Sequence, residues 1–549
     1  QKELYQSGGI SHILAISGLH ISLVGMLLYR FLRKKKRSYP FSALVSGSCM
    51  VVYGLLTGFG VSAKRAVFMF LVYLGAELLG ETYDVVSALA LSGLLILAEQ
   101  PLQLFQCGFQ LSFLSVGAVA LVYPALQKRL GWRKKAALSL LSGLSVTLFT
   151  LPCTLYWFYE WMPYAVFLNL IVIPLVPVVF LSGAAGMLTG GASVAAGMFL
   201  AGASAGVLRF FQTLLERTEV LAGSRAVIGQ PEFWQIALYY VLVGAAVWGG
   251  KRKEKREKSR ENKLLRTAGI ILALCILCFP FHRPAEVTFL DVGQGDAVFL
   301  RTETGTTCLI DGGSTTVSDV GTYRLLPFLK SRGVSALDYL FLSHMDADHI
   351  NGAEELLKDQ FHGIPIRHLC LSALPGDETR ERLEKEARLF GTELCYISRG
   401  TVFREEGAEI RCLSPVKGQK KEDENANSEV LMVEISGLRI LFTGDLGEEG
   451  EQELLEAGTD LRAAVLKVGH HGSRFSTGEA FLEAVSPNVA VISCAENNRY
   501  GHPAPETVER LEQADCRVFY TMKSGAITLY PADGKKGWKL EQKFDRIER

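Results

Sequence analysis

The sequence predicts a multi-domain protein in which a polytopic α-helical membrane domain precedes a soluble domain of mixed strands and helices. The mean hydropathy of the 549 residues is positive, at +0.22, and long apolar segments fill the first half. After Pro284, short β-rich runs alternate with glycine. We expect a membrane domain over 1–249, a basic cytoplasmic loop with the last membrane helix over 250–284, and the soluble domain over 285–549.

Ten apolar segments precede the soluble domain. Several reach the roughly 20 residues with which a helix crosses a bilayer, whereas 66–79 and 85–98 are short enough to lie at the interface or to be re-entrant. The segments are 10–31, 41–59, 66–79, 85–98, 105–126, 136–158, 164–188, 195–215, 233–248 and 264–281.

Charge is informative locally rather than globally. The net charge of +1 indicates no polyanionic partner by itself. The basic clusters 33–37, 128–135 and 251–266 are each separated by four apolar segments, so the positive-inside rule places all three in the cytoplasm. One further crossing puts the C-terminal domain on the extracytoplasmic side of a bacterial cell membrane, with lipids around the helices. Lys64 and Arg65 fall on the outer side, which is the weakest point of this topology.

The first apolar segment carries candidate channel residues. His12 and His20 are eight residues apart and so lie roughly on one helical face, and an ionisable group inside an apolar segment is costly unless it meets a polar cavity or a partner. A pore role and a structural role both stay open for them. Ser17 and Gly18 belong to the same motif, although small residues also serve close helix packing.

Prolines inside the apolar segments predict broken helices, which a membrane tolerates where the freed backbone faces protein or water. They are Pro152, Pro163, Pro174 and Pro177.

The C-terminal half predicts two β-sheets covered by helices. We expect strands at 287–290, 297–302, 307–310, 339–342, 368–371, 431–435, 439–442, 463–468, 489–493 and 517–520. We expect helices at 324–331, 352–358, 380–390, 447–456, 479–484 and 506–512.

Residues 343–349 hold two histidines and two aspartates directly after an apolar strand. Such a set is hard to satisfy in an apolar interior without a shared cation, and catalytic zinc sites are displayed on loops of this kind. His344 and Asp346 can point one way, whereas the adjacent Asp348 and His349 point differently. This arrangement favours two metal ions over one.

Two further strands end in ligand-type residues. Asp445 follows strand 439–442, and a carboxylate is the usual bridge between two cations. His470 and His471 follow strand 463–468 and add imidazole. Paired divalent cations are suited to activating water near neutral pH, so the pattern indicates a hydrolytic metal centre.

The spacings resemble the metallo-β-lactamase superfamily, whose H-x-H-x-D-H signature appears as His344-x-Asp346-x-Asp348-His349. The resemblance implies an αββα fold. Asp346 stands where most of the superfamily has a histidine, and the extra oxygen ligand makes manganese a competitor to zinc. No histidine lies between His368 and Asp445 to serve as the usual third imidazole ligand, and Asn427 is the only side chain in a plausible position.

The same resemblance implies the assignment of ligands. The first ion would be held by His344, Asp346 and Asp445. The second would be held by Asp348, His349, Asp445 and one of the two adjacent histidines, for which we prefer His471.

Four residues are the candidates for catalysis: Asp348, His470, Lys467 and His502. We expect His470 to face the substrate phosphate. His502 either donates a proton to the leaving oxygen or sits on a turn without a role. Lys467 is either a charge clamp on the substrate or a lysine that extends its charge to solvent.

Both halves together resemble the ComEC competence proteins. The resemblance rests on residues 12–20, 291–297, 311–313, 343–349 and 498–503. It implies a membrane channel for single-stranded DNA in natural transformation, with an outer domain that degrades the other strand by hydrolysis. It also implies other competence proteins as partners, among them a DNA receptor and a translocase ATPase, and leaves a homodimer open.

Two alternatives stay open. One is a membrane-anchored metallohydrolase of small or lipid-linked esters, and the other is a transporter with a catalytically silent metal domain. Gln1 is not an initiator methionine, so we expect that residues precede it in a longer protein.

Overall fold

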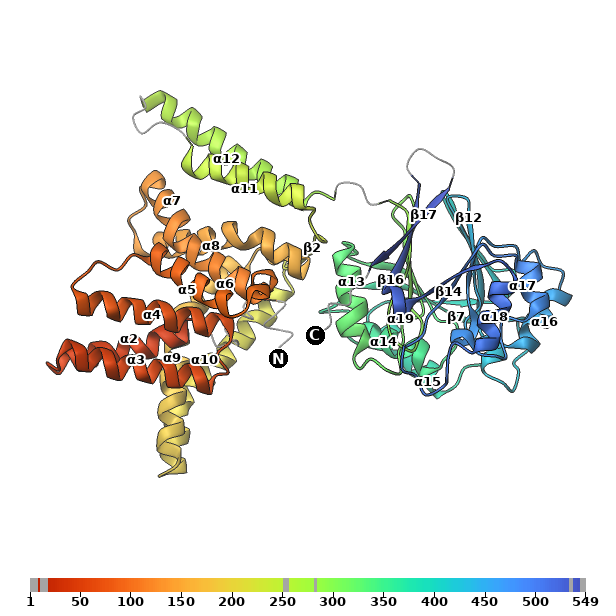
Figure 1. Cartoon of the computed structure of the whole chain (residues 1–549), viewed down its shortest axis with the longest axis horizontal. Helices are drawn as coiled ribbons and strands as arrows, with labels where there is room; N and C mark the ends of the chain where they lie inside the picture. The colour runs from red at the N-terminus through yellow and green to blue at the C-terminus, as the bar shows by residue number, and fades with distance from the viewer. Residues whose placement is uncertain (1–7, 10–17, 250–255, 281–283, 533–536, 544–549) are drawn as a thin grey trace. The chain divides into compact units, whose positions relative to one another are not determined.

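The computed structural model describes residues 8–9, 18–249, 256–280, 284–532 and 537–543. The chain divides into two compact units, one ending at Phe279 and the other starting at Pro280 (Figure 1). The first unit consists almost entirely of helices, and the second carries two β-sheets.

Each predicted apolar segment coincides with a helix over most of the residues that the structure describes. Five described helices are long and apolar enough to cross a membrane: Tyr39–Leu56, Cys107–Leu130, Lys135–Phe158, Ala165–Gly190 and Val194–Glu219. The helical elements are α2 (Gly18–Lys34), α3 (Tyr39–Leu56), α4 (Val61–Leu79), α5 (Val85–Glu99), η2 (Pro101–Phe105), α6 (Cys107–Gly117), η3 (Ala118–Val122), α7 (Tyr123–Leu130), α8 (Lys135–Phe158), α9 (Ala165–Gly190), α10 (Val194–Glu219), α11 (Phe233–Trp248) and α12 (Arg256–Cys278). A short ladder joins β1 (Glu160–Trp161) to β2 (Ala226–Val227).

The prediction of broken helices is wrong for three of the four prolines. Pro152 lies inside the continuous helix α8, and Pro174 and Pro177 lie inside α9. Pro163 lies in the turn between β1 and α9.

Neighbouring side chains explain why α8 tolerates its proline. Pro152 has no N–H to offer the carbonyl four residues earlier, which belongs to Leu148. The hydroxyl of Tyr239 in α11 donates to that carbonyl oxygen at 2.6 Å, and the hydroxyl of Tyr240 donates to the carbonyl oxygen of Phe149 at 2.9 Å. Helix α11 therefore supplies the donor that the proline removes, through Tyr239, and Tyr240 adds a second bond to the neighbouring carbonyl, as is usual where a transmembrane helix carries proline.

The two basic residues that strain the predicted topology both find polar partners on other helices. The ammonium of Lys64 lies 2.6 Å from a carboxylate oxygen of Glu99, and Nε of Arg65 donates to the hydroxyl of Ser112 at 2.9 Å. These contacts lower the cost of placing both cations in the helical unit.

The second unit is a sandwich of two mixed sheets. One sheet has the order β17-β16-β3-β4-β5-β6-β7-β8, and the other has the order β15-β14-β13-β12-β11-β10-β9. The strands are β3 (Glu286–Phe289), β4 (Val298–Arg301), β5 (Thr307–Ile310), β6 (Leu337–Phe341), β7 (Ile366–Ser372), β8 (Glu393–Ile397), β9 (Val402–Glu405), β10 (Ala408–Ser414), β11 (Val430–Ile435), β12 (Leu438–Phe442), β13 (Val465–Lys467), β14 (Val489–Ile492), β15 (Arg517–Tyr520), β16 (Ala526–Pro531) and β17 (Trp538–Lys543).

Three apolar layers hold this unit together. The layer between the sheets includes Phe289, Phe341 and Phe442. A second layer packs one sheet against α13 (Leu326–Ser331), α14 (Ala347–Lys358) and α15 (Glu378–Leu389), and a third packs the other sheet against α16 (Glu448–Glu456), α17 (Glu479–Val485) and α18 (Pro505–Gln513). The predicted αββα sandwich is confirmed (Figure 1).

All ten predicted strands and six predicted helices of this unit are present with small shifts of their ends. Five strands were not predicted: β8, β9, β10, β16 and β17. Polar and charged residues interrupt most of these strands, and three of them, β8, β9 and β17, pair on one side only.

Candidate metal centre

The ligand-type residues lie on loops that leave four strands. Strands β12 and β13 are parallel neighbours, so Asp445 and the His470-His471 pair emerge at the same edge of one sheet. Strands β5 and β6 are parallel neighbours in the other sheet, and they lead to Asp311 and to the 343–349 signature. The two sheets thus bring their loops together at one end of the sandwich.

Two glycines let the loops close on the signature. A Cβ atom added to Gly295 would lie 2.3 Å from the carbonyl oxygen of Gly313 and 2.6 Å from that of Asp348. A Cβ atom added to Gly313 would lie 2.4 Å from the backbone nitrogen of His349. Only glycine fits such approaches, which allow the backbone N–H of Asp296 to donate to the carbonyl oxygen of Asp348 at 3.0 Å.

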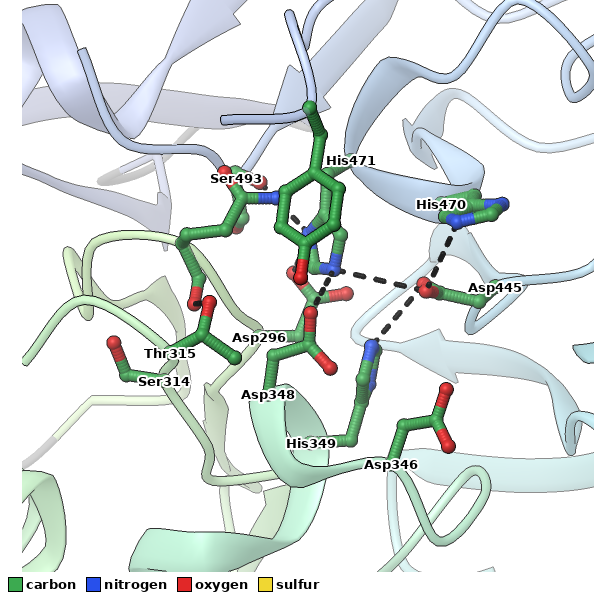
Figure 2. A network of polar contacts seen from close by, with 12 residues as sticks. Asp296, Ser314, Thr315, Asp346, Asp348, His349, Asp445, His470, His471 and Ser493 are labelled. Carbon is green, nitrogen blue, oxygen red and sulfur yellow. Dashed lines mark hydrogen bonds and ion pairs between the residues drawn. The ribbon is translucent and has the colours of Figure 1, made fainter. Parts of the chain in front are cut away.

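Asp445 is the centre of the cluster (Figure 2). Its Oδ1 lies 3.1 Å from Nε2 of His349, and its Oδ2 lies 3.7 Å from Nε2 of His471 and 3.8 Å from Nε2 of His470. Nε2 of His344 lies 4.0 Å from the same Oδ2. One buried carboxylate therefore faces four imidazoles.

Asp348 completes the cluster from the first turn of α14. Its Oδ2 lies 3.4 Å from Nε2 of His471, which is the second carboxylate contact of that nitrogen (Figure 2). His471 thus faces Asp348 and Asp445 with one ring nitrogen, while its Nδ1 lies 3.0 Å from the carbonyl oxygen of Ser493.

The charges in the cluster support one another. Burial lowers the pKa of His349, but Asp445 and Asp311 raise it more, so the net pKa lies well above the usual value of histidine. Burial raises the pKa of Asp445, but His349 and His471 lower it more, so the net pKa lies well below the usual value of aspartate. The carboxylate stays ionised at neutral pH and is ready to bind a cation.

Buried atoms without hydrogen-bond partners show that a metal ion fits here. Nε2 of His344 and of His471 are buried and have no hydrogen-bond partner among the described residues, and the buried Nε2 of His349 and Oδ1 of Asp445 face only each other, at 3.1 Å. Such atoms are costly unless a cation satisfies them. Ligand atoms lie within 4.8 Å of one another in the groups His344-His349-Asp445, Asp348-His349-His471, Asp296-Asp445-His471 and Asp296-Asp311-His349.

These groups agree with part of the predicted ligand set. His349, Asp445 and His471 recur in them, and His344 and Asp348 each join one. Asp346 joins none: its side chain is 55% exposed, and its Oδ2 lies 3.6 Å from Nε2 of His344. It lies at the open edge of the cluster.

The histidine pair adopts a backbone that few side chains accept. His470 and His471 have φ values of +48° and +53°, in the left-handed region. Two consecutive residues there cost of order 1–3 kcal/mol each, and such strain concentrates at functional sites. The turn lets His471 point into the buried cluster while His470 remains half-buried at its edge.

A buried hydrogen-bond network behind the ligands was not predicted as part of the site. Oδ2 of Asp311 lies 3.0 Å from Nδ1 of His349, and the same carboxylate accepts from the backbone N–H and the hydroxyl of Ser343. The hydroxyl of Ser343 lies 3.0 Å from Nδ1 of His344. Carboxylate partners of this kind orient ligand histidines. The Asp-Gly-Gly run after β5 was the sequence signal for Asp311.

The structure places Lys467 behind the cluster. Its ammonium is buried, lies 2.8 Å from Oδ2 of Asp296 and donates to the carbonyl oxygen of Val468. Oδ1 of Asp296 in turn lies 3.6 Å from Nδ1 of His471. Neither predicted role of Lys467, a clamp on the substrate or an extended solvent-facing charge, fits this position; it anchors Asp296, another residue that the sequence did not single out.

His502 borders the cluster. Its ring centroid lies 5.6 Å from that of His470 and 6.4 Å from that of His471. Burial, then the two neighbouring histidines, lower the pKa of His502 to about 4. The imidazole is therefore neutral at pH 7 in the absence of a ligand, and both predicted alternatives for His502, a proton donor and a turn residue without a role, stay predictions.

Asn427 is engaged elsewhere. Its amide donates to the carbonyl oxygens of Lys421 and Asp423 and accepts from the backbone N–H of Lys421. Its oxygen and nitrogen thus hold the 421–427 loop, and the structure gives Asn427 no ligand role.

The predicted channel residues are only partly described. His12 and Ser17 lie outside the described residues. Gly18 and His20 lie in the first turn of α2.

Comparisons with known proteins match both units. The family model for competence proteins matches residues 1–253, and the model for the metallo-β-lactamase superfamily matches residues 290–496. ComE operon protein 3 of Bacillus subtilis (strain 168) is 30% identical over 543 residues, which cover 95% of this chain and 68% of that protein. Competence protein ComA of Neisseria gonorrhoeae is 29% identical over 550 residues, which cover 94% and 70%.

A solved structure aligns with part of the chain. It is the metallo-β-lactamase fold protein YhfI from Bacillus subtilis, with a TM-score of 0.31 and 12% identity, covering 44% of this chain and 99% of that one.

Proposed function

We propose that this chain, which belongs to the ComEC family of competence proteins, is a bacterial membrane channel for the uptake of single-stranded DNA. We further propose that its metallo-β-lactamase-fold domain hydrolyses phosphodiester bonds of the strand that is not transported. The observation that carries the hydrolytic part is the set of buried imidazole and carboxylate atoms without hydrogen-bond partners around Asp445.

The residues present would hold two divalent ions, zinc or manganese. His344 and Asp445 would belong to one ion, and Asp348, His349 and His471 to the other, because Nε2 of His349 can bind only one ion. When bound, paired cations activate water and neutralise the negative charge that develops on the phosphate. The mixed oxygen and nitrogen donors suit both metals.

The remaining residues act on the substrate side or behind the ligands. His470 is half-buried at the edge of the cluster, where its imidazole would contact a phosphate oxygen. Burial raises the pKa of Asp348, but its hydrogen bond to His471 and the charges of His349 and His471 together lower it more, so the carboxylate stays ionised at neutral pH and would orient the attacking water by accepting its hydrogen bond. Lys467 would keep His471 in position through Asp296, and Asp311 would orient His349 directly.

We assign transport to the helical unit. We place the metal domain on the extracytoplasmic side of the membrane. The basic clusters support this orientation through the positive-inside rule. A DNA receptor and a translocase ATPase are the proposed partners. An alkaline phosphatase fused to the C-terminus should be active in intact cells; a fusion that is inactive there but stable would contradict the orientation.

The hydrolytic function is tested on the purified full chain. With Mn²⁺ or Zn²⁺ it should cleave end-labelled DNA, and Asp445→Ala should lose at least about a hundred-fold of this activity, because ligands exceed the 10–100-fold effects of their outer partners. Asp460→Ala, which removes an exposed aspartate beside Arg439, is the matched control and should cleave normally.

One outcome would overturn the nuclease, and two further measurements would then separate the alternatives. A chain that binds two metal ions yet leaves both single- and double-stranded DNA intact has no nuclease activity. If it then cleaves small or lipid-linked esters, it is a membrane-anchored metallohydrolase. If it cleaves nothing and Asp348→Ala leaves DNA uptake intact, the metal domain is silent and the helical unit alone serves transport.

A further inference from the structure

The loop that carries His502 also carries an exposed aromatic residue beside the metal centre. Tyr500 is 47% exposed, and its ring centroid lies 5.7 Å from that of His502. Since the ring of His502 lies 5.6 Å from that of His470, Tyr500 borders the side of the cluster on which His470 remains accessible. A flat apolar ring at this place is not needed for any contact within the metal centre.

An arginine covers the same ring. The guanidinium carbon of Arg499 lies 4.8 Å from the ring centroid of Tyr500, and its NH2 group donates to the Tyr500 hydroxyl at 2.6 Å. Arg499 is exposed, and Asp348 of the metal centre interacts with its positive charge electrostatically. The pair therefore offers an exposed ring together with a positive charge beside the cluster.

The loop is held in shape before any ligand arrives. The side chain of Asn498 accepts from the backbone N–H groups of Tyr500 and His502 and donates to the carbonyl oxygens of Ala495 and His502. Little conformational freedom remains to be lost when the loop binds a ligand, which favours affinity.

A second pair of the same kind follows the ligand histidines. Phe475 is 66% exposed, and the guanidinium carbon of Arg474 lies 6.0 Å from its ring centroid. Arg474 has an acidic neighbour, Glu506, at 3.8 Å, so its charge is partly offset. Two aromatic-arginine pairs thus lie on the two loops that carry His470-His471 and His502.

We propose that Arg499-Tyr500, assisted by Arg474-Phe475, forms a base-stacking platform that selects unpaired nucleotides for the metal centre. The inference rests on the proposed DNA-cleaving function and specifies its substrate as single-stranded DNA or the frayed end of a duplex. Exposed aromatic rings stack on bases of any sequence, and neighbouring arginines attract the phosphates. In an intact duplex the base faces are already stacked on one another, so Tyr500 can only reach unpaired bases.

Binding is measured on the full chain in detergent, by fluorescence anisotropy of a labelled single-stranded 12-mer. Tyr500→Ala should weaken binding about five-fold or more, the effect of losing one stacked base, whereas Tyr500→Phe should retain it. A 12-mer with 2-aminopurine at its end should be quenched by the wild type and by Tyr500→Phe, but much less by Tyr500→Ala.

Two controls separate stacking from general damage. A 12-mer of abasic sites keeps the phosphates but has no rings, so Tyr500→Ala should bind it as the wild type does. Tyr396→Ala removes an equally exposed ring, 47%, from β8, where it lies 5.1 Å from the guanidinium carbon of Arg380 in α15, and it should change nothing. The metal content of every variant is measured in parallel and should stay constant.

Unchanged binding and quenching in Tyr500→Ala would overturn the platform. So would an equal loss of affinity for the abasic strand, which would assign the effect to charge or folding. A wild type that binds and quenches as predicted but cleaves no DNA would overturn the nuclease and leave the platform standing. Equal DNA cleavage by the wild type and Tyr500→Ala would overturn the platform and leave the nuclease standing.

Discussion

The two units differ in where their buried polar atoms without partners lie. In the helical unit, the carbonyl freed by Pro152 accepts from Tyr239, and buried atoms without a partner among the described residues, such as the hydroxyl of Ser42 and Oδ1 of Asn169, lie on different helices. In the sandwich, Nε2 of three buried histidines and Oδ1 of Asp445 lie in one cluster and have no hydrogen-bond partner among the described residues outside that cluster.

This difference indicates which unit binds a cation. Polar groups that satisfy one another stabilise a fold, whereas buried ligand-type groups that converge without other partners indicate a cation-binding site. Among the described residues, every group with metal-ligand geometry lies in the sandwich. Substitutions in each unit test this difference.

The largest effect is expected at a predicted ligand. Asp348→Ala removes the carboxylate at 3.4 Å from Nε2 of His471, so it should lower the affinity for one metal ion and reduce DNA cleavage by at least about a hundred-fold. Metal titration and cleavage kinetics measure both. Asp359→Ala, at the opposite end of α14, is the control and should have neither effect. Normal cleavage by Asp348→Ala would remove Asp348 from the site.

A large effect on stability is expected behind the site. Lys467→Met leaves Asp296 buried without its cation, and breaking a buried ion pair costs about 3–5 kcal/mol. The comparison is Arg439→Met, which breaks the surface pair with Asp460 and should cost about 0–1 kcal/mol. Denaturant unfolding of the full chain gives both values. Equal costs would mean that Lys467 is not the anchor of Asp296.

A smaller, pH-dependent effect is expected at Glu429. Burial, then the nearby Asp311, raise the pKa of this carboxyl well above its usual value, and neither oxygen has a hydrogen-bond partner among the described residues. Its effect is smaller than that of Lys467→Met because the group keeps its proton instead of becoming a bare charge.

The sign follows from linkage. Above about pH 4.3, the ordinary pKa of glutamate, the unfolded chain loses this proton while the folded chain keeps it, so stability falls as pH rises toward the raised pKa. Glu429→Gln cannot ionise and should flatten this part of the stability curve, with the largest gain over wild type at the alkaline end. Thermal unfolding at pH 5 and pH 8 measures it; parallel curves for the two proteins would contradict the assignment.

The smallest effect is expected in the helical unit. Tyr239→Phe removes the donor to the carbonyl oxygen of Leu148 and should cost about 0.6 kcal/mol, the average for such bonds in a membrane. In a Pro152→Ala background the helix supplies its own N–H, so the same change should cost less. Unfolding in detergent gives this double-mutant cycle, and strict additivity would show that Tyr239 does not compensate for Pro152.

The sequence predicted more of the fold than of the site. Hydropathy and alternation located the helices and ten strands, but β8 to β10 and the final hairpin carry polar residues that weaken the pattern. Five of the six predicted ligands come together around Asp445, because they follow strands of the two sheets whose loops meet at one end of the sandwich.

The rest depended on contacts between distant loops. Asp296 and Asp311 lie behind the histidines only because Gly295 and Gly313 allow close approach, which spacing alone does not reveal. Lys467 and Pro152 were misjudged for a related reason: their partners, Asp296 and Tyr239 of α11, are remote in sequence.

The most direct test is the number of metal ions bound to the freshly purified full chain, measured by elemental analysis for the wild type and Asp445→Ala. The contacts of Asp445 with His344, His349 and His471 predict close to two divalent ions per chain, and a marked loss in the variant. A wild-type chain without bound transition-metal ions, or a variant that keeps both, would contradict a metal centre built around this carboxylate.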